Sequence, residues 1–202
     1  MMPAAFVLVA YLIGSISFAV VVSWCAGLPD PHTYGSGNPG ATNVLRSGKK
    51  SAAALTLIGD GAKGALALWL AMRLAPEFEL GEMTLAAVAL AAFLGHVFPL
   101  YFRFKGGKGV ATAAGILLVL DARIAGIALL IWLITVLALR YSSLAAIAAA
   151  LAAPITALVL LGWGPYSWMV LAMAALLLWR HRGNIERLVK GTESRIRFSR
   201  GV

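Results

Sequence analysis

Long apolar runs separated by short polar interruptions make up almost the whole chain. The runs cover residues 3–26, 51–74, 83–102, 110–120, 122–139, 142–161 and 165–179. Most approach the roughly 20 residues that a helix needs to cross the hydrocarbon core of a bilayer. The run 110–120 is too short for a straight crossing, so it is either a half-helix or one part of a broken element with the next run. We predict an all-α, polytopic integral membrane protein in which residues 1–202 form a single domain.

The composition agrees with a membrane protein. Hydrophobic residues make up 61% of the chain and charged residues 12%, whereas a soluble domain is nearer half apolar and one quarter charged. The net charge of +9 does not indicate nucleic-acid binding, because Lys and Arg gather between and after the apolar runs. A single cysteine, Cys25, excludes an internal disulfide. Three histidines without an acidic cluster argue against a metal site, and we expect no cofactor.

The distribution of basic residues predicts the topology. With the N-terminus outside and every run crossing, the inner segments carry most of the Lys and Arg, as the positive-inside rule requires. These basic residues are Arg46, Lys49, Lys50, Arg103, Lys105, Lys108, Arg140 and the tail from Arg180 onward, including Arg197 and Arg200. The outer segments hold Arg73 and Arg123 beside four acidic residues. We expect about seven transmembrane helices with the N-terminus outside and the C-terminus cytoplasmic. Merging the runs 110–120 and 122–139 would give six crossings and leave the basic tail outside.

Three polar segments share the predicted inner face. They are the opening loop "YGSGNPGATNVLRSGKK" (residues 34–50), the segment "FKGGKGVAT" (residues 104–112), whose residues 104–109 we call the glycine loop, and the tail segment "WRHRGNIERLVKGTE" (residues 179–193). Glycine-rich turns let backbone N–H groups cradle an anion, and a following helix N-terminus adds a favourable dipole. The glycine loop does not match the P-loop pattern, so it implies no nucleotide-binding fold.

The side chains of these segments suit phosphate groups. Neutral donors and one bidentate guanidinium come from the opening loop, namely Ser36, Asn38, Thr42, Asn43 and Arg46. Lys108 stands on the glycine turn, and His181 and Asn184 lie three residues apart in the tail segment. Two anion cradles and a His-x-x-Asn pair on one face predict that two phosphorylated partners meet at the membrane surface.

Other interpretations of these residues stay open at this point. Glycine turns between membrane helices are often only turns, and inner basic residues such as Arg140 are often topology anchors. Asp60 and Lys63 are either a structural ion pair within a membrane run or a support for the site. A non-catalytic assembly factor, or a small anion transporter or channel, would also be rich in apolar helices. A transporter needs a polar path to the outer face, however, and the outer halves of the runs are almost wholly apolar.

Four segments of the chain resemble the bacterial PlsY family of membrane glycerol-3-phosphate acyltransferases. They read "GSGNPGATNVLR", "GDGAKG", "GHVFPLYFRFKGGKGVAT" and "HRGNIERLVKGTE", and the resemblance extends in order from Tyr11 to Glu193. It implies transfer of a fatty acyl group from acyl phosphate to the 1-hydroxyl of glycerol 3-phosphate. The products are lysophosphatidate and inorganic phosphate, in the first step of phospholipid synthesis. It further implies a bacterial inner-membrane protein whose site faces the cytoplasm, supplied by an upstream enzyme that makes acyl phosphate.

The resemblance also implies the site residues. The catalytic set is Ser36, Lys108, His181 and Asn184. The substrate-binding set comprises these four with Gly37, Asn38, Thr42, Asn43, Arg46, Lys105, Gly106 and Gly107.

The chemistry of an acyl phosphate explains why such residues suffice. The acyl group is already activated, so the site must bring the substrates together, neutralise phosphate charge and stabilise an oxyanion. We expect His181 and Asn184 to donate hydrogen bonds that orient the acceptor. We expect a substrate phosphate, with its second pKa near 6, to take the hydroxyl proton. We do not expect His181 and Glu186 to form the His-x4-Asp dyad of another acyltransferase class.

Overall fold

The computed structural model describes residues 2–196, which contain helices and no strand. The α-helices are α1 (Met2–Gly14), α2 (Phe18–Cys25), α3 (Ala41–Leu45), α4 (Lys50–Phe78), α5 (Glu82–Val97), α6 (Val110–Leu120), α7 (Ala122–Leu139), α8 (Ser142–Leu161), α9 (Pro165–Arg180) and α10 (Arg182–Val189). A short 3-10 helix, η1 (Leu100–Phe102), follows α5. Arg197 and Arg200, which we assigned to the basic tail, lie outside the described residues.

The apolar runs became helices with nearly the expected bounds. The bounds of α6, α7 and α8 coincide with the expected runs 110–120, 122–139 and 142–161. Asp121 separates α6 from α7, because its carboxylate accepts a hydrogen bond from the Arg123 amide (2.8 Å) and caps the second helix. The short run is therefore a helix of its own.

Several helices are long and apolar enough to span a bilayer. Within residues 2–196 these are α4, α5 continued by η1, α7 and α8, and a fifth if α1 and α2 are counted as one span bent by 40°. The prediction of an all-α polytopic membrane fold is confirmed. The count of seven crossings and the orientation of the termini stay predictions.

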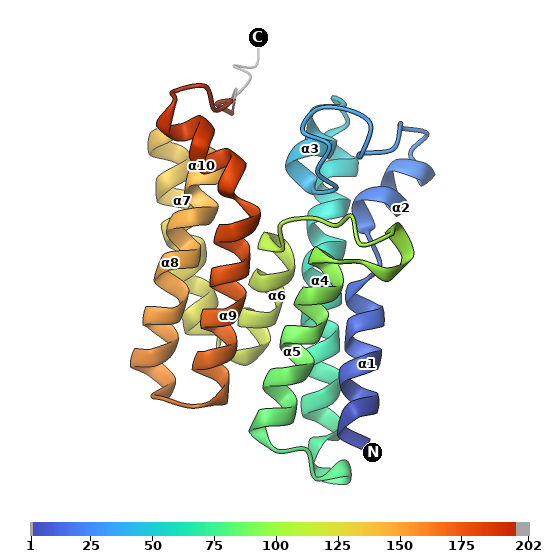
Figure 1. Cartoon of the computed structure of the whole chain (residues 1–202), viewed down its shortest axis with the longest axis vertical. Coiled ribbons are helices and arrows are strands. Elements are labelled where there is room, and N and C mark those ends of the chain that lie inside the picture. Colours follow the sequence, from blue (N-terminus) through green and yellow to red (C-terminus); the bar gives the residue numbers. More distant parts are fainter. Residues whose placement is uncertain (1, 197–202) are drawn as a thin grey trace.

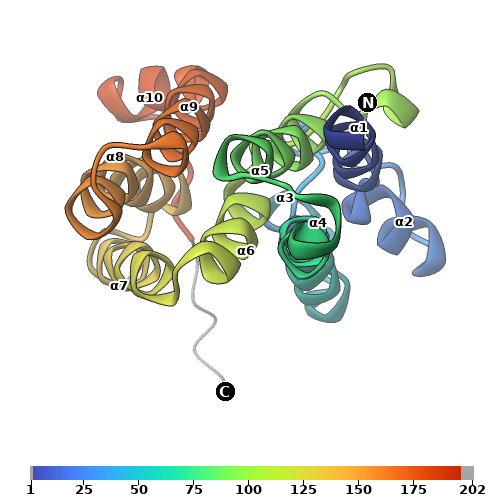
Figure 2. The same ribbon diagram turned by 90° about the horizontal axis from the view of Figure 1, so that it is seen from below.

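The helices form two groups joined by α6. In Figure 2, α1, α4 and α5 lie on one side and α7, α8 and α9 on the other, with α6 between them. Figure 1 shows α3 and α10 at the end of the bundle opposite the N-terminus, and the connection from α5 to α6 closer to mid-height. The three polar segments of the sequence therefore lie in the same half of the molecule.

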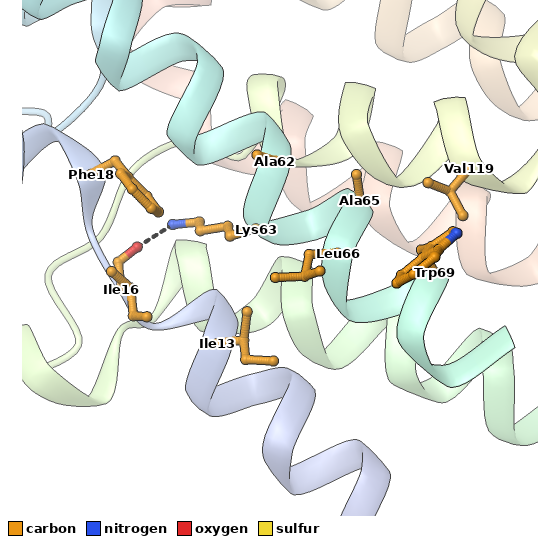
Figure 3. A pocket seen from close by; sticks show the side chains of 9 residues that line it. All are labelled: Ile13, Ile16, Phe18, Ala62, Lys63, Ala65, Leu66, Trp69 and Val119. Atoms are coloured by element: carbon orange, nitrogen blue, oxygen red, sulfur yellow. Dashed lines mark hydrogen bonds between the residues drawn. The ribbon is translucent and has the colours of Figure 1, made fainter. Parts of the chain in front are cut away.

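The first apolar run differs from the single helix that we expected over residues 3–26. It breaks at Ser15–Ser17 into α1 and α2. The break leaves backbone groups without helical partners, and α4 satisfies them: Lys63 donates from Nζ to the Ile16 carbonyl oxygen at 2.5 Å, and Asp60 Oδ1 accepts from the Phe18 amide at 3.4 Å. Figure 3 shows the lysine reaching the break past an otherwise apolar groove of about 460 Å³. Unpaired backbone at membrane depth is costly, so this pairing makes the break possible.

Close packing holds the short helix α6 in place. A Cβ added to Gly115 would come within 2.0 Å of the Gly61 carbonyl oxygen, so the two helices touch through backbone. Buried Thr112 donates its hydroxyl to the Asp60 carbonyl oxygen at 2.8 Å. These contacts fix the start of α6, and with it the glycine loop, against α4.

Candidate active site

A cavity of about 1670 Å³ opens where the opening loop, the glycine loop and the tail segment meet. Every site residue expected from the sequence lines this cavity except Gly107, which lies behind the wall. The lining residues among them are Ser36, Gly37, Asn38, Thr42, Asn43, Arg46, Lys105, Gly106, Lys108, His181 and Asn184. The structure thus brings together segments separated by up to about 150 positions along the chain.

The opening loop is organised by one buried asparagine. Asn43 Nδ2 donates to the carbonyl oxygens of Pro31 (2.8 Å) and Tyr34 (3.1 Å), and its Oδ1 accepts from the Ser36 amide (2.9 Å). Its side chain is therefore occupied by the loop, and we assign it to holding Ser36 in place rather than to substrate contact. Arg46 donates from Nη2 to Oγ of Ser194, the residue that follows the tail segment, at 3.0 Å.

The glycine loop presses against the end of α5. The Gly107 amide donates to the His96 carbonyl oxygen at 3.1 Å. A Cβ at Gly107 would lie 2.2 Å from His96 Nε2, and one at Gly106 would lie 2.2 Å from the His96 carbonyl oxygen. Any side chain here would displace the loop, which is the physical reason for the glycine pair. Arg103, which precedes the loop, and Phe104, its first residue, are in the left-handed region at φ of 52° and 61°, a conformation that costs energy for residues other than glycine.

Arg180, on the last turn of α9, holds the same loop from its other side. Its Nη2 donates to the Gly106 carbonyl oxygen (2.6 Å) and its Nε to the Gly107 carbonyl oxygen (3.2 Å). Charge-assisted bonds to consecutive carbonyls fix the orientation of both peptides. The amide of Lys108 and the turn leading into α6 are fixed as a result.

A chain of polar contacts runs from the glycine loop into the tail segment. Lys108 donates from Nζ to Asn184 Oδ1, and Asn184 Nδ2 donates to Glu193 Oε1 at 2.7 Å. Glu193 also accepts from Ser143 Oγ (2.7 Å) and Arg187 Nε (2.7 Å). Asn184 therefore orients the lysine, while Glu193 ties α10 to α8.

Charge in the cavity is mostly positive. Burial lowers the pKa of Lys108 to about 8, with Glu193 opposing this shift and Arg187, Arg180 and Arg46 adding to it. Burial alone would raise the pKa of Glu193, but its hydrogen bonds lower that pKa below the usual value. The Lys and Arg side chains of the lining outnumber its three carboxylates, Asp60, Glu186 and Glu193, and each carboxylate already pairs with a cation. The cavity is therefore a site for anions.

His181 is buried at the junction of α9 and α10. Its Nδ1 lies 2.8 Å from the Leu177 carbonyl oxygen, and because a carbonyl only accepts, Nδ1 carries the proton. Burial lowers the pKa of His181 to about 4, so the neutral ring offers Nε2 as an acceptor. This corrects our expectation that the ring donates a hydrogen bond to the acceptor substrate. Glu186 pairs with Lys190 at 2.6 Å instead of with the ring.

Beneath the cavity lies the buried charge pair of α4. Asp60 Oδ1 is 2.9 Å from Lys63 Nζ and 3.6 Å from His96 Nδ1. Asp60 and His96 also line the cavity. Asp60 and Lys63 therefore form a buried ion pair. Asp60 also contacts His96, the residue against which the glycine loop packs.

Comparison with known proteins identifies the family. Residues 4–191 match the family described as glycerol-3-phosphate acyltransferase. The chain belongs to the PlsY family of glycerol-3-phosphate acyltransferases. Proteins of that name from Cupriavidus pinatubonensis and Cupriavidus necator are each 59% identical over 191 residues, covering 95% of both chains.

The fold is that of a PlsY membrane enzyme. A crystal structure of PlsY in its glycerol 3-phosphate form is 38% identical and superposes with a TM-score of 0.90, covering 98% of this chain and 96% of the other. The lysophosphatidic acid form gives a TM-score of 0.89 at 37% identity. Membership in the PlsY family makes the chain an integral membrane acyltransferase and removes the transporter and assembly-factor interpretations.

Sequence reasoning missed several residues of the cavity. The sequence placed Arg180 in the basic tail and Glu193 in the tail segment, but it indicated no role for either residue. Glu193 is one of only two acidic residues in the tail segment. His32 was not considered, and no periodic pattern marks it. The scarcity of acidic residues in this basic segment is the one signal that could have identified Glu193.

Proposed function

We propose that this PlsY-family chain transfers a fatty acyl group from acyl phosphate to the 1-hydroxyl of sn-glycerol 3-phosphate. The products are 1-acyl-glycerol 3-phosphate and inorganic phosphate, in the first step of bacterial phospholipid synthesis. One observation carries the proposal: two loops suited to phosphate, with Arg46 on one and Lys108 on the other, face a single cavity. A related PlsY structure exists in glycerol 3-phosphate and lysophosphatidic acid forms, which supports the acceptor and the product.

In the proposed step, the acceptor hydroxyl oxygen attacks the acyl carbon of acyl phosphate. A tetrahedral oxyanion forms, the bond between the acyl carbon and the bridging oxygen breaks, and that oxygen leaves with the phosphate. Arg46, Lys108 and the glycine-loop amides neutralise the phosphates and the oxyanion. Because the acyl donor is already activated, binding and orientation supply most of the acceleration.

The hydroxyl proton goes to a substrate phosphate. His181 Nε2 accepts a hydrogen bond from the hydroxyl and aims it at the acyl carbon. With its pKa at about 4, this ring is a weaker base than a phosphate monoester, whose second pKa is about 6. Proton transfer therefore favours the phosphate over the histidine.

The acyl chain of the bound donor extends from the cavity past apolar side chains toward the lipid. Leu57 on α4, Val110 on α6 and Trp132 on α7 are apolar residues in the lining of the cavity. Leu57 is 54% exposed on the helix surface, where a membrane helix meets lipid. A bilayer-embedded donor thus places its phosphate in the cavity while its chain stays in an apolar environment.

The cavity faces the cytoplasm in the proposed orientation, within the bacterial inner membrane. Glycerol 3-phosphate then arrives from the cytosol, and an upstream enzyme that produces acyl phosphate supplies the donor. The whole chain acts as one membrane acyltransferase domain without a cofactor.

A comparison of donors tests the proposal. The detergent-purified protein receives glycerol 3-phosphate with either palmitoyl phosphate or palmitoyl-CoA, and 1-acyl-glycerol 3-phosphate is measured. Acyl phosphate should support product formation and acyl-CoA should not, because the glycine loop and opening loop are short and form no adenine-binding fold. Robust turnover with acyl-CoA would contradict the proposed donor.

A further inference from the structure

His32 connects the two phosphate-binding loops. It lies in residues 28–33, which lead into the opening loop, and its side chain is 21% exposed. Its Nδ1 is 2.7 Å from Asp30 Oδ1, and its Nε2 is 2.9 Å from the Lys105 carbonyl oxygen in the glycine loop. The His32 amide also donates to Asp30 Oδ1 at 2.9 Å. His32 lines the cavity beside Lys105.

Both partners of the ring can only accept hydrogen bonds. A carbonyl oxygen has no proton, and a carboxylate has none when ionised. Burial alone would raise the pKa of Asp30, but its hydrogen bonds from His32 and the charge of the ring lower that pKa below the usual value. Asp30 is therefore a carboxylate across the neutral range. Both ring nitrogens must then donate at once, which only the imidazolium form can do.

We propose that His32 is a positioning residue: its imidazolium ties residues 28–33 to the glycine loop, and this clasp opens as the ring loses its proton with rising pH. A neutral ring has one N–H, so it keeps either the Asp30 contact or the Lys105 contact. When either contact is lost, the glycine loop, which carries Lys108, loses its tie to Asp30 through the ring, although Arg180 and the His96 carbonyl still hold it. The expected kinetic effect is a higher KM for a phosphate substrate at higher pH. This effect rests on the proposed function.

Charged groups of both signs lie near the ring in the sequence and the fold. Asp30 on its own segment is the carboxylate in contact with the ring. The glycine loop and its entry carry the cations Arg103, Lys105 and Lys108. The neighbouring ring of Phe102, 6.5 Å away between centroids, is neutral. A bound phosphate would shield these cations and favour the clasp.

Two substitutions separate charge from packing in a kinetic test. His32→Arg keeps donors for both acceptors and is always charged, whereas His32→Gln is neutral at every pH. The measured quantity is kcat/KM from pH 5.5 to 8.5, expressed as the ratio of wild type to each variant. The ratio cancels titration of the substrates and of Lys108, which are common to all three proteins.

The proposal predicts that both ratios fall as pH rises, but from different starting values. The ratio of wild type to His32→Gln should be about threefold at low pH, the size typical of partly exposed charged contacts, and should fall toward one at high pH, mostly through KM. The ratio of wild type to His32→Arg should start near one and drop as pH rises. Ratios that stay constant with pH for both variants would overturn the proposal.

A spectroscopic measurement tests the clasp without relying on activity. The chain has three histidines, so protein labelled with ¹⁵N-histidine gives three pairs of ring-nitrogen signals, and the His32 pair is the one missing in His32→Arg. At pH 5.5 both nitrogens of His32 should carry protons. A bare ring nitrogen on His32 at that pH would overturn the proposal even in an active enzyme. An inactive enzyme with a doubly protonated ring would instead count against the proposed function alone.

Discussion

Arg46 and Lys108 belong to different loops, and each supplies a positive charge to the lining of the cavity. Arg46→Ala and Lys108→Ala should each lower kcat by about 10²–10³, the usual loss for a preorganised group that stabilises transition-state charge. Lys108→Arg should also fail, since a planar guanidinium does not fit a point-charge position on a tight glycine turn.

The measurement is turnover of purified variants with acyl phosphate. Exposed Lys190, which pairs with Glu186 outside the loops, provides the control Lys190→Ala, expected to keep wild-type activity. Near-normal turnover in Arg46→Ala or Lys108→Ala, at normal expression and normal melting temperature, would contradict the assignment of these loops.

The role of His181 is tested by a substitution that preserves an acceptor. His181→Gln presents an amide oxygen that accepts a hydrogen bond from the substrate hydroxyl, so it should retain measurable activity, while His181→Ala should lose more. A true general base contributes about 10²–10⁴-fold. If His181→Gln were as inactive as His181→Ala, the histidine rather than the phosphate would be the base.

The pH dependence follows from two groups. The rate should rise as pH passes about 6, where the substrate phosphate becomes dianionic and able to take a proton. It should fall as pH passes about 8, because Lys108 has its pKa lowered to about 8 and its neutral form loses the charge that binds phosphate. A profile of kcat/KM, corrected for spontaneous hydrolysis of acyl phosphate, reports these values for the free species. A flat profile between pH 7 and 9.5 would argue against Lys108 as a phosphate-binding cation.

The sequence located most cavity residues but not all of their roles. Ser36, Arg46 and Lys108 were predictable because donors on glycine-rich turns have a recognisable chemistry. The role of Asn43 was not predictable, since its side chain resembles a substrate donor until the carbonyls of Pro31 and Tyr34 are seen to occupy it. His32 required knowledge that a residue 73 positions away places a carbonyl beside its ring.

At the scale of elements, the glycine loop is held in place between the ends of α5 and α9. Arg180→Gln should raise the KM for a phosphate substrate by about tenfold, because two charge-assisted bonds that orient the Gly106 and Gly107 peptides are lost. Arg180→Lys should restore the KM only in part, because one ammonium group does not reach both carbonyl oxygens. The control is Arg73→Gln, an exposed arginine near the far end of α4. Equal KM values for Arg180→Gln and Arg73→Gln would remove Arg180 from the site.

The helix bounds were predictable where an apolar run ends at a polar residue, as α7 does at Arg140. The break between α1 and α2 was not, because the residues around Ser15 carry no proline and only a short polar interruption. That break depends on Asp60 and Lys63, whose positions in space are set by the packing of α4 against α1 and α6. Tertiary partners of this kind leave no local pattern.

At the scale of the whole molecule, the account requires one orientation in the bilayer. In a Cys25→Ser background, single cysteines replace Arg123 and Lys190, which we place on opposite sides. A membrane-impermeant thiol reagent applied to spheroplasts should label Arg123→Cys at once and Lys190→Cys only after permeabilisation. The reverse pattern would put the cavity on the outer face, away from cytosolic glycerol 3-phosphate.

The most direct test of the central claim follows the bridging oxygen of the donor. Palmitoyl phosphate carrying ¹⁸O between carbon and phosphorus is incubated with glycerol 3-phosphate and the purified protein, and both products are analysed by mass spectrometry. Attack at the acyl carbon predicts one 1-acyl-glycerol 3-phosphate for each inorganic phosphate, with the label in the phosphate. Label retained in free palmitate, or phosphate released without acylated product, would contradict acyl transfer at this cavity.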